Sequence, residues 1–178
     1  MINRREFLLS SGAFAFPFIT GCANFGYRAN EKVNVAVIGI GARGAEDVES
    51  LEATGIANFV AFADTEIRGE WTASVRKAYP NVPCFDDFRK MFDKMGDQID
   101  AVLVATPDHS HFAACMAAMQ CGKSVYTEKP MGNTFREIQV MIDMAVKNPK
   151  LVTQMGNQGH SLANYYQSKE MAKRGLFD

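Results

Sequence analysis

Residues 33–44 read VNVAVIGIGARG, an apolar run that leads into three glycines at positions 39, 41 and 44. The β-branched residues predict a buried strand over residues 33–38, and Val48 with Leu51 predicts an amphipathic helix directly after the last glycine. A strand, a G-x-G-x-x-G turn and a helix in this order are typical of a segment that cradles a dinucleotide pyrophosphate. The segment therefore predicts an α/β fold with a nucleotide site at the end of its first strand.

Each position of this turn has a predicted role. Gly39 makes the turn, Gly41 lets the backbone approach the pyrophosphate, and Gly44 lets helix and strand pack closely. The residues between them complete a cofactor-binding segment at the helix N-terminus, where negative charge is favoured; they are Ile40, Ala42 and Arg43. An ordinary glycine turn is the alternative interpretation.

Asp64 follows the next strand-like run, 20 residues after Gly44. A carboxylate at this spacing accepts a hydrogen bond from the adenosine ribose 2′-hydroxyl, so it favours NAD as the cofactor. NADP is the less favoured alternative, because Arg43 and Arg68 could offset the repulsion between Asp64 and a 2′-phosphate.

Strand-like runs alternate with helical patterns along the rest of the chain, and they predict a Rossmann-type, doubly wound parallel sheet with helices on both faces. Two helical stripes and a capping box over residues 134–137 support the helices, and the stripe of Phe and Met residues is expected in the core. The strand-like runs cover residues 33–38, 58–63, 82–85, 101–105, 124–127 and 151–155, and the stripes are Trp71, Val75, Ala78 and Phe88, Met91, Phe92, Met95.

The segment TPDHSH (residues 106–111) follows the fourth run, where ligands bind in such sheets. We expect Thr106 and Pro107 to form a rigid wall against the cofactor, and Asp108 or Ser110 to cap the following helix. His109 and His111 could instead ligate a metal. This alternative is disfavoured because the chain has one further histidine, His160, and no acidic cluster nearby, so we expect no metal.

Two more segments at strand ends carry candidate residues. In TEKPMG (127–132), Lys129 would stand in the ligand crevice and serve as an acid or base, unless the segment is a surface turn. In MGNQGHS (155–161), the glycines permit close backbone approach, and Asn157, Gln158 and His160 are candidates for substrate contact. An ordinary polar loop is an equally weighted interpretation of the second segment.

The first 22 residues have the order of a signal peptide: Arg4 and Arg5, an apolar stretch over 7–19, and Gly21 before Cys22. The stretch is shorter than the roughly 20 residues that span a bilayer. NRREFLL resembles a twin-arginine motif, and ITGC resembles a lipobox in which Cys22 becomes acylated. We therefore expect a bacterial protein exported to the periplasm or cell envelope and anchored by Cys22, with residues 23–32 as a tether.

The composition excludes two classes of protein. Hydrophobic residues make up 47% of the 178-residue chain, charged residues 22%, and the net charge is −1. These values predict neither a disordered chain nor a nucleic-acid-binding one. The cysteines lack C-x-x-C spacing, so we expect Cys84, Cys115 and Cys121 to be buried thiols.

The segments VAVIGIGARG, AFAD, IDAVLVATPDHSH and YTEKPMG resemble, in order and spacing, the Gfo/Idh/MocA oxidoreductase family over residues 33–160. The resemblance implies an NAD(P)-binding Rossmann domain and chemistry at a carbohydrate or cyclitol hydroxyl. It implies that Glu128 contacts the nicotinamide ribose and that Lys129, beside the cofactor, contacts the substrate hydroxyl. It also places the segment with Thr106, Pro107, His109 and His111 along the cofactor cleft.

Members of that family continue into a second domain that binds substrate and carries a catalytic histidine. We therefore expect residues 161–178 to begin the connection to such a substrate domain, which is absent from this chain. Three functions stay open: an exported NAD(P)-dependent oxidoreductase, an NAD-dependent redox-assisted glycoside hydrolase, and a nucleotide-binding chain without turnover. An isolated Rossmann half would expose the face that its partner domain buries, which favours homo-oligomers.

Overall fold

The computed structural model describes residues 32–161 and 163–176. The predicted signal peptide with Cys22, and residues 23–31 of the predicted tether, lie outside the described residues. Within the described part of the chain, no helix has the length and hydropathy that crossing a membrane requires.

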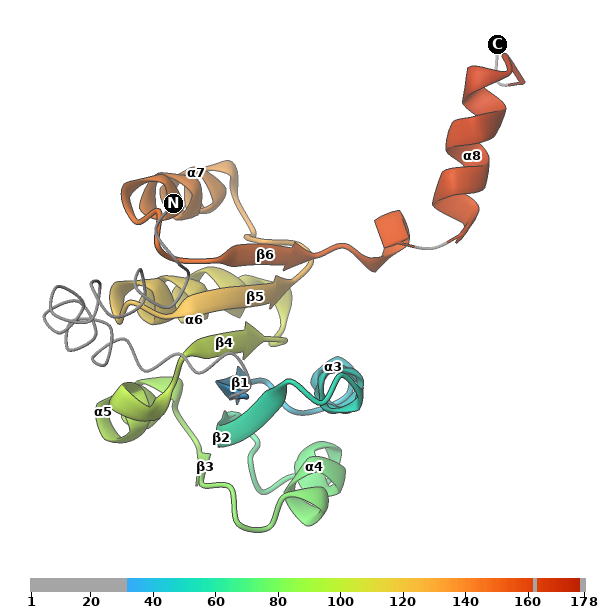
Figure 1. Ribbon diagram of the computed structural model, residues 1–178. Helices are drawn as coiled ribbons and strands as arrows, with labels where there is room; N and C mark the ends of the chain where they lie inside the picture. Colours follow the sequence, from blue (N-terminus) through green and yellow to red (C-terminus); the bar gives the residue numbers. More distant parts are fainter. Residues whose placement is uncertain (1–31, 162, 177–178) are drawn as a thin grey trace, which may run out of the picture. The chain divides into compact units, whose positions relative to one another are not determined.

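Strands and helices alternate through the described residues (Figure 1). The strands are β1 (Val33–Ile38), β2 (Ala57–Ala63), β3 (Cys84–Phe85), β4 (Ala101–Val104), β5 (Ser124–Glu128) and β6 (Thr153–Gly156). The α-helices are α3 (Arg43–Ala53), α4 (Ala73–Ala78), α5 (Phe88–Met95), α6 (Asp108–Gln120), α7 (Phe135–Lys147) and α8 (Ala163–Lys173). Short 3-10 turns are η1 (Glu70–Thr72), η2 (Gly96–Gln98) and η3 (Gln158–Ser161).

The six strands form one parallel sheet in the order β3-β2-β1-β4-β5-β6. The predicted doubly wound fold is thereby confirmed. The strand order reverses between β1 and β4, so ligands are expected beyond the carboxyl ends of these two strands. β5 pairs with a neighbour on each side, which places its last residues inside the sheet rather than at an edge.

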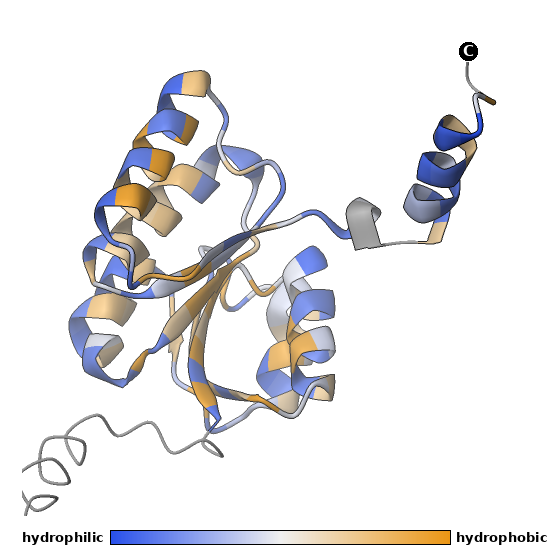
Figure 2. Ribbon diagram, turned by 45° about the horizontal axis from the view of Figure 1, so that its top comes forward, coloured by the Kyte–Doolittle hydropathy of each residue, from blue (hydrophilic) through white to orange (hydrophobic). Residues whose placement is uncertain are grey.

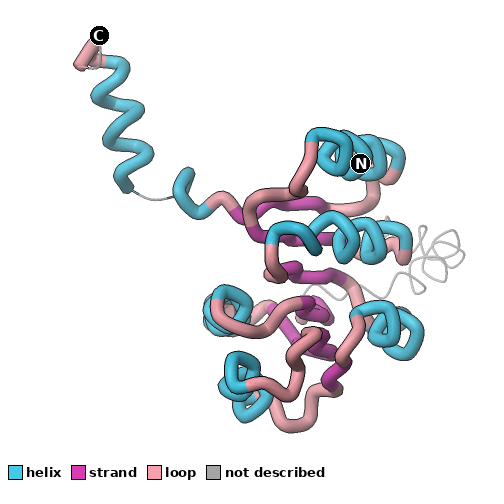
Figure 3. The backbone as a smooth tube through the Cα atoms, turned by 180° about the vertical axis from the view of Figure 1, so that it is seen from behind, coloured by secondary structure: helices cyan, strands magenta, loops and turns pink. Residues whose placement is uncertain are grey.

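Helices cover the two faces of the sheet separately: α3 and α4 lie on one face, and α5, α6 and α7 lie on the other (Figure 3). Two cores of buried side chains match these layers, one that includes Val48 and Val75 and one that includes Met91, Cys115 and Met141. Figure 2 shows largely apolar strands between two sets of helices in which apolar and polar residues alternate. Burial of this apolar surface is the main stabilising contribution to such a fold.

The predicted capping box at the start of α7 is confirmed. The Thr134 hydroxyl accepts a hydrogen bond from the Glu137 N–H, and the Glu137 carboxylate accepts one from the Thr134 N–H. The stripe of Phe88, Met91, Phe92 and Met95 also lies in the core, as predicted.

The helical stripe of Trp71, Val75 and Ala78 and the burial of two cysteines were predicted wrongly. Trp71 is 72% exposed, because it belongs to η1 and α4 begins only at Ala73, so Trp71 and Val75 do not share a helical face. Ala78 is exposed too. Of the three cysteines expected in the core, Cys115 is buried, whereas Cys84 lies on the short strand β3 and Cys121 ends α6, and both are exposed.

Candidate functional site

A cleft of about 610 Å³ lies where the sheet order reverses. The turn after β1, the end of β2 and the start of α6 meet there, as expected for a doubly wound sheet. Its lining includes Gly39, Gly41, Ala42, Arg43, Asp64, Trp71, Thr106, Pro107, His109 and Ser110. Most of the residues predicted to bind the cofactor are therefore brought together by the fold.

The glycine turn depends on the lack of side chains at two positions. Gly39 has a φ of 86°, and a Cβ atom there would lie 2.7 Å from the Ala105 backbone. A Cβ atom at Gly44 would overlap the Gly39 carbonyl oxygen. The turn is thus packed against the end of β4, and Gly41, whose Cβ position is 3.3 Å from the Trp71 Cβ, faces the cleft.

The other residues of the turn differ in where they lie. Ile40 is fully buried, so its side chain belongs to the core rather than to the cleft. Ala42 has a positive φ of 40°, a conformation that an alanine rarely adopts, and immediately precedes α3. Ala42 and Arg43, the first residue of α3, both line the cleft, so the N-terminus of α3 lies at its wall.

Asp64 directly follows β2 and lies in the cleft lining. Its two carboxylate oxygens accept hydrogen bonds from the Ile40 N–H (3.0 Å) and the Glu66 N–H (2.9 Å). The first bond ties the carboxylate to the glycine turn. Each carboxylate oxygen can accept more than one hydrogen bond, so Asp64 retains the capacity to bind a ribose hydroxyl.

The start of α6 differs from the prediction in two ways. Neither Asp108 nor Ser110 caps the helix: the N-cap residue is Pro107, and Asp108 is already the first helical residue. His111 is 1% exposed and does not line the cleft. Its Nδ1 lies 2.6 Å from the Pro130 carbonyl oxygen and its Nε2 lies 2.7 Å from the Thr106 carbonyl oxygen, so the ring bridges the segments after β4 and β5.

Glu128 and Lys129 stand where β5 ends. Glu128 is 4% exposed, whereas the Lys129 side chain is exposed, and the Lys129–Pro130 peptide bond is cis. Neither residue belongs to the lining of the 610 Å³ cleft. The Lys129 side chain is therefore accessible to solvent, while Glu128 is held inside the fold.

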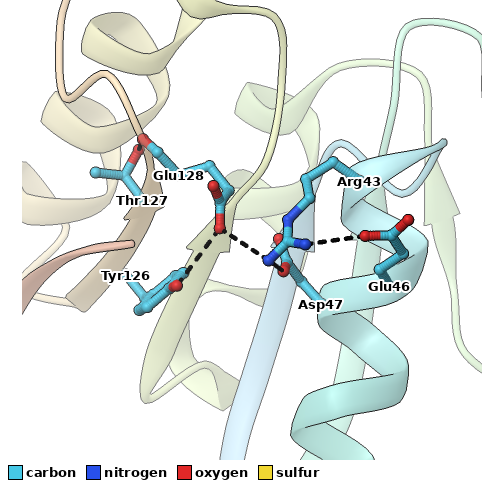
Figure 4. A network of polar contacts seen from close by, with 6 residues as sticks. All are labelled: Arg43, Glu46, Asp47, Tyr126, Thr127 and Glu128. Atoms are coloured by element: carbon cyan, nitrogen blue, oxygen red, sulfur yellow. Dashed lines mark hydrogen bonds and ion pairs between the residues drawn. The ribbon is translucent and has the colours of Figure 1, made fainter. Parts of the chain in front are cut away.

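A network of polar contacts connects Glu128 to α3 (Figure 4). The Arg43 guanidinium contacts Asp47 (2.6 Å), Glu46 (2.9 Å) and Glu128 (3.3 Å). Burial is the main cause that raises the pKa of the Asp47 carboxyl to about 6; Arg43 opposes the shift, and the charge of Glu128 adds to it. Burial and the charges of Glu128 and Asp47 likewise raise the pKa of Tyr126, so its hydroxyl remains a donor at neutral pH.

The sequence analysis missed three residues of this network, Glu46, Asp47 and Tyr126. Asp47 lies four residues after Arg43 on one helix, and this spacing could have identified it as an ion-pair partner. Tyr126 lies in a strand-like run, where an aromatic residue looks like any core residue, so no local pattern distinguishes it.

The segment after β6 contains the residues predicted to face the substrate. Asn157 and Gln158 are exposed, Gln158 in the turn η3. The His160 side chain lies outside the described part of the structure. Among the described residues, no group of three His, Cys, Asp or Glu side chains could hold a metal ion.

A parallel sheet with this strand order, a glycine turn at the switch point and an acidic residue after β2 together define a dinucleotide-binding Rossmann domain. The model of the oxidoreductase family with an NAD-binding Rossmann fold, Gfo/Idh/MocA, matches residues 33–155. The chain belongs to this family.

The chain is similar to several proteins of known name. It is 32% identical to inositol 2-dehydrogenase 1 of Saccharopolyspora erythraea, covering 80% of this chain and 42% of that protein. It is 27% identical to an α-N-acetylgalactosaminidase of Shewanella oneidensis, covering 99% of this chain and 44% of that protein. The structure of a Lactobacillus casei scyllo-inositol dehydrogenase, solved with NAD(H) and scyllo-inositol, matches with a TM-score of 0.67 at 22% identity. The match covers 82% of this chain and 42% of that chain. The chain thus spans less than half the length of these relatives.

Proposed function

We propose that the chain is the nucleotide-binding part of an NAD-dependent oxidoreductase that acts on a hydroxyl of a sugar or cyclitol. The observation that carries the proposal is the cleft at the switch point, where the glycine turn, Asp64 and the Thr106–Pro107 wall converge. Family membership and the names of the relatives support the substrate class.

The residues of the cleft fit a dinucleotide. Gly41 leaves room for the pyrophosphate against the N-terminus of α3, and Asp64 would accept a hydrogen bond from the adenosine ribose. Glu128 would contact the nicotinamide ribose. The exposed Lys129 amine would hydrogen-bond the substrate hydroxyl and help to remove its proton. The nicotinamide ring supplies the hydride acceptor when the cofactor is bound.

NAD is favoured over NADP by two features. Asp64 places a negative charge beside the ribose site, and Arg43, which could have offset it, is engaged by Asp47 and Glu128 instead. We expect calorimetry on this chain to show NAD binding at least about tenfold tighter than NADP, and Asp64→Ala to narrow that ratio. Equal affinities would refute the assignment of NAD, and no binding of either nucleotide would refute the proposed function.

Redox-assisted glycoside hydrolysis is the second candidate. The similarity to the α-N-acetylgalactosaminidase extends over 99% of this chain, which favours it. In this reaction a sugar hydroxyl is transiently oxidised, the acidified neighbouring C–H loses its proton as the glycosidic oxygen leaves, water adds, and the oxidation is reversed. In assays of the native protein, release of sugar from a glycoside without net NADH would distinguish it from a dehydrogenase.

We also propose that the protein is exported and anchored by an acylated Cys22. The twin arginines at positions 4 and 5 and the ITGC segment support this proposal. Twin-arginine export carries folded passengers, so a protein that binds its cofactor before export could keep it. The mass of the native protein from the membrane fraction tests the anchor: an N-terminus at diacylated Cys22 is expected, and an unprocessed N-terminus or a Cys22→Ser variant that stays membrane-bound would refute it.

A further inference from the structure

One oxygen of the Glu128 carboxylate is held by donors from two elements. Glu128 Oε1 accepts hydrogen bonds from Arg43 Nη2 (3.3 Å) and from the Tyr126 hydroxyl (3.4 Å). Arg43 is the first residue of α3, and Tyr126 lies two residues before Glu128 on β5. Figure 4 shows the other carboxylate oxygen turned away from both donors. That second oxygen makes neither of these contacts, so its lone pairs are the ones most open to a hydrogen bond from a ligand.

Asp47 determines where the Arg43 guanidinium points. Arg43 Nη2 lies 2.6 Å from Asp47 Oδ1, and the Asp47 side chain is 6% exposed one turn along α3. The same nitrogen contacts Glu128, so the guanidinium lies between two buried carboxylates. Glu46 contacts the other guanidinium nitrogen, but its side chain is 69% exposed. Interactions of buried charges are much stronger than those of exposed ones, so Asp47 rather than Glu46 orients Arg43.

Gly156, the last residue of β6, packs against the contact between the Glu128 carboxylate and the Tyr126 hydroxyl. A Cβ atom at Gly156 would lie 2.8 Å from Glu128 Oε1 and would overlap the Tyr126 hydroxyl. Gly156 is buried. The Glu128 carboxylate fits beside it because glycine has no side chain. Glu128 is therefore confined by α3, β5 and β6 together.

We infer that Asp47, through Arg43 and together with Tyr126 and Gly156, positions the Glu128 carboxylate for the nicotinamide ribose of the cofactor. This inference rests on the proposed function, because that proposal is what assigns the nicotinamide ribose to Glu128. It makes Asp47 a positioning residue that touches neither cofactor nor substrate. Loss of Asp47 should thus weaken only ligands that reach Glu128.

A comparison of NAD with ADP tests the inference, because ADP shares the adenosine and pyrophosphate contacts but has no nicotinamide ribose. We expect Asp47→Ala to weaken NAD binding about five- to tenfold in calorimetry and to leave ADP binding unchanged or stronger, since the freed Arg43 can approach the pyrophosphate. Glu46→Ala makes a matched change on the exposed side of the same guanidinium and should leave the NAD-to-ADP ratio within about twofold of the original.

Gly156→Ala provides an independent variant, because it removes no polar group and crowds Glu128 Oε1 together with the Tyr126 hydroxyl that holds it. It too should weaken NAD but not ADP. Equal losses for both nucleotides in the two variants, or an unchanged NAD affinity in a folded Asp47→Ala protein, would overturn the inference. If the unaltered chain binds ADP but not NAD, the proposed function fails instead.

Discussion

At the scale of single residues, polar side chains carry the connections between the strand ends. Asp64 ties the glycine turn to β2, His111 bridges the segments after β4 and β5, and Arg43 links α3 to β5. His111 is buried, Asp64 is half-buried and Arg43 is exposed, but each contacts specific partners on another element. The site is therefore sensitive to substitutions outside the cleft lining.

Asp47 makes the stability of the protein depend on pH. Its pKa is raised to about 6 in the fold, beside Arg43, Glu46, Glu128 and Tyr126, so the folded state binds more protons than the unfolded state between about pH 4 and 6. Stability from this group is present below that window and is lost as the pH rises through it.

We expect urea unfolding of the original protein and Asp47→Asn to show this. The free energy of unfolding of the original protein, relative to the variant, should fall by about 2 to 3 kcal/mol between pH 4 and pH 7, because the amide does not titrate. A difference that does not change with pH would contradict the shifted pKa.

Replacing each of the two histidines of the TPDHSH segment by alanine should change the stability of the protein by very different amounts. His111→Ala removes a buried ring that packs between the carbonyl oxygens of Thr106 and Pro130 and donates a hydrogen bond to one of them, so we expect a loss of about 2 to 3 kcal/mol in the free energy of unfolding. His109 is exposed in the cleft lining, and His109→Ala should change it by less than about 0.5 kcal/mol. Chemical denaturation measures both, and equal effects would contradict the bridging position of His111.

At the scale of elements, the close packing of β1, α3 and β4 forms the pyrophosphate turn. The helix can begin so near the strand because no side chain stands at position 44 or 39. The order of apolar runs and glycines was enough to predict this arrangement. It was not enough to predict that η1 interrupts the run before α4 and leaves Trp71 exposed at the cleft.

Gly44→Ala tests this packing. Gly96, a glycine of the same chain with open space around it, provides the control. A Cβ atom at position 44 meets the Gly39 carbonyl oxygen, so we expect a destabilisation of about 2 to 3 kcal/mol. Gly96 has no atom within 4 Å of the Cβ position and a φ of −49°, so Gly96→Ala should be neutral or slightly stabilising, by up to about 1 kcal/mol. Thermal or urea unfolding of both variants measures these changes in stability. A Gly44→Ala protein as stable as the original would contradict the close packing of the turn.

At the scale of the whole molecule, segments far apart in the sequence contribute to one cleft. Its lining combines residues from the turn after β1, the end of β2, the segment before α5 and the start of α6. A ligand that spans these segments binds only the folded chain, so binding must raise its stability.

We expect NAD at about 100 times its dissociation constant to stabilise the fold by about 2.7 kcal/mol, which corresponds to a rise in Tm of roughly 5 to 10 °C. Differential scanning fluorimetry measures the shift. Nicotinamide at the same concentration lacks the pyrophosphate and adenosine and serves as the control. A shift of equal size with nicotinamide would mean that the cleft does not bind the dinucleotide as a whole.

The sequence by itself determined the class of fold, the glycine turn, Asp64 and the capping box of α7, because these features depend on local periodicity and on backbone conformations that few residue types allow. Only the tertiary structure decided that His111 turns into the fold rather than into the cleft, and that Arg43 joins Asp47 to Glu128. Those contacts connect residues 19 and 85 positions apart along the chain, and His111 and Arg43 each had several partners of suitable chemistry. Which partner a side chain meets depends on how the strands pair and the helices pack, and no local pattern records that.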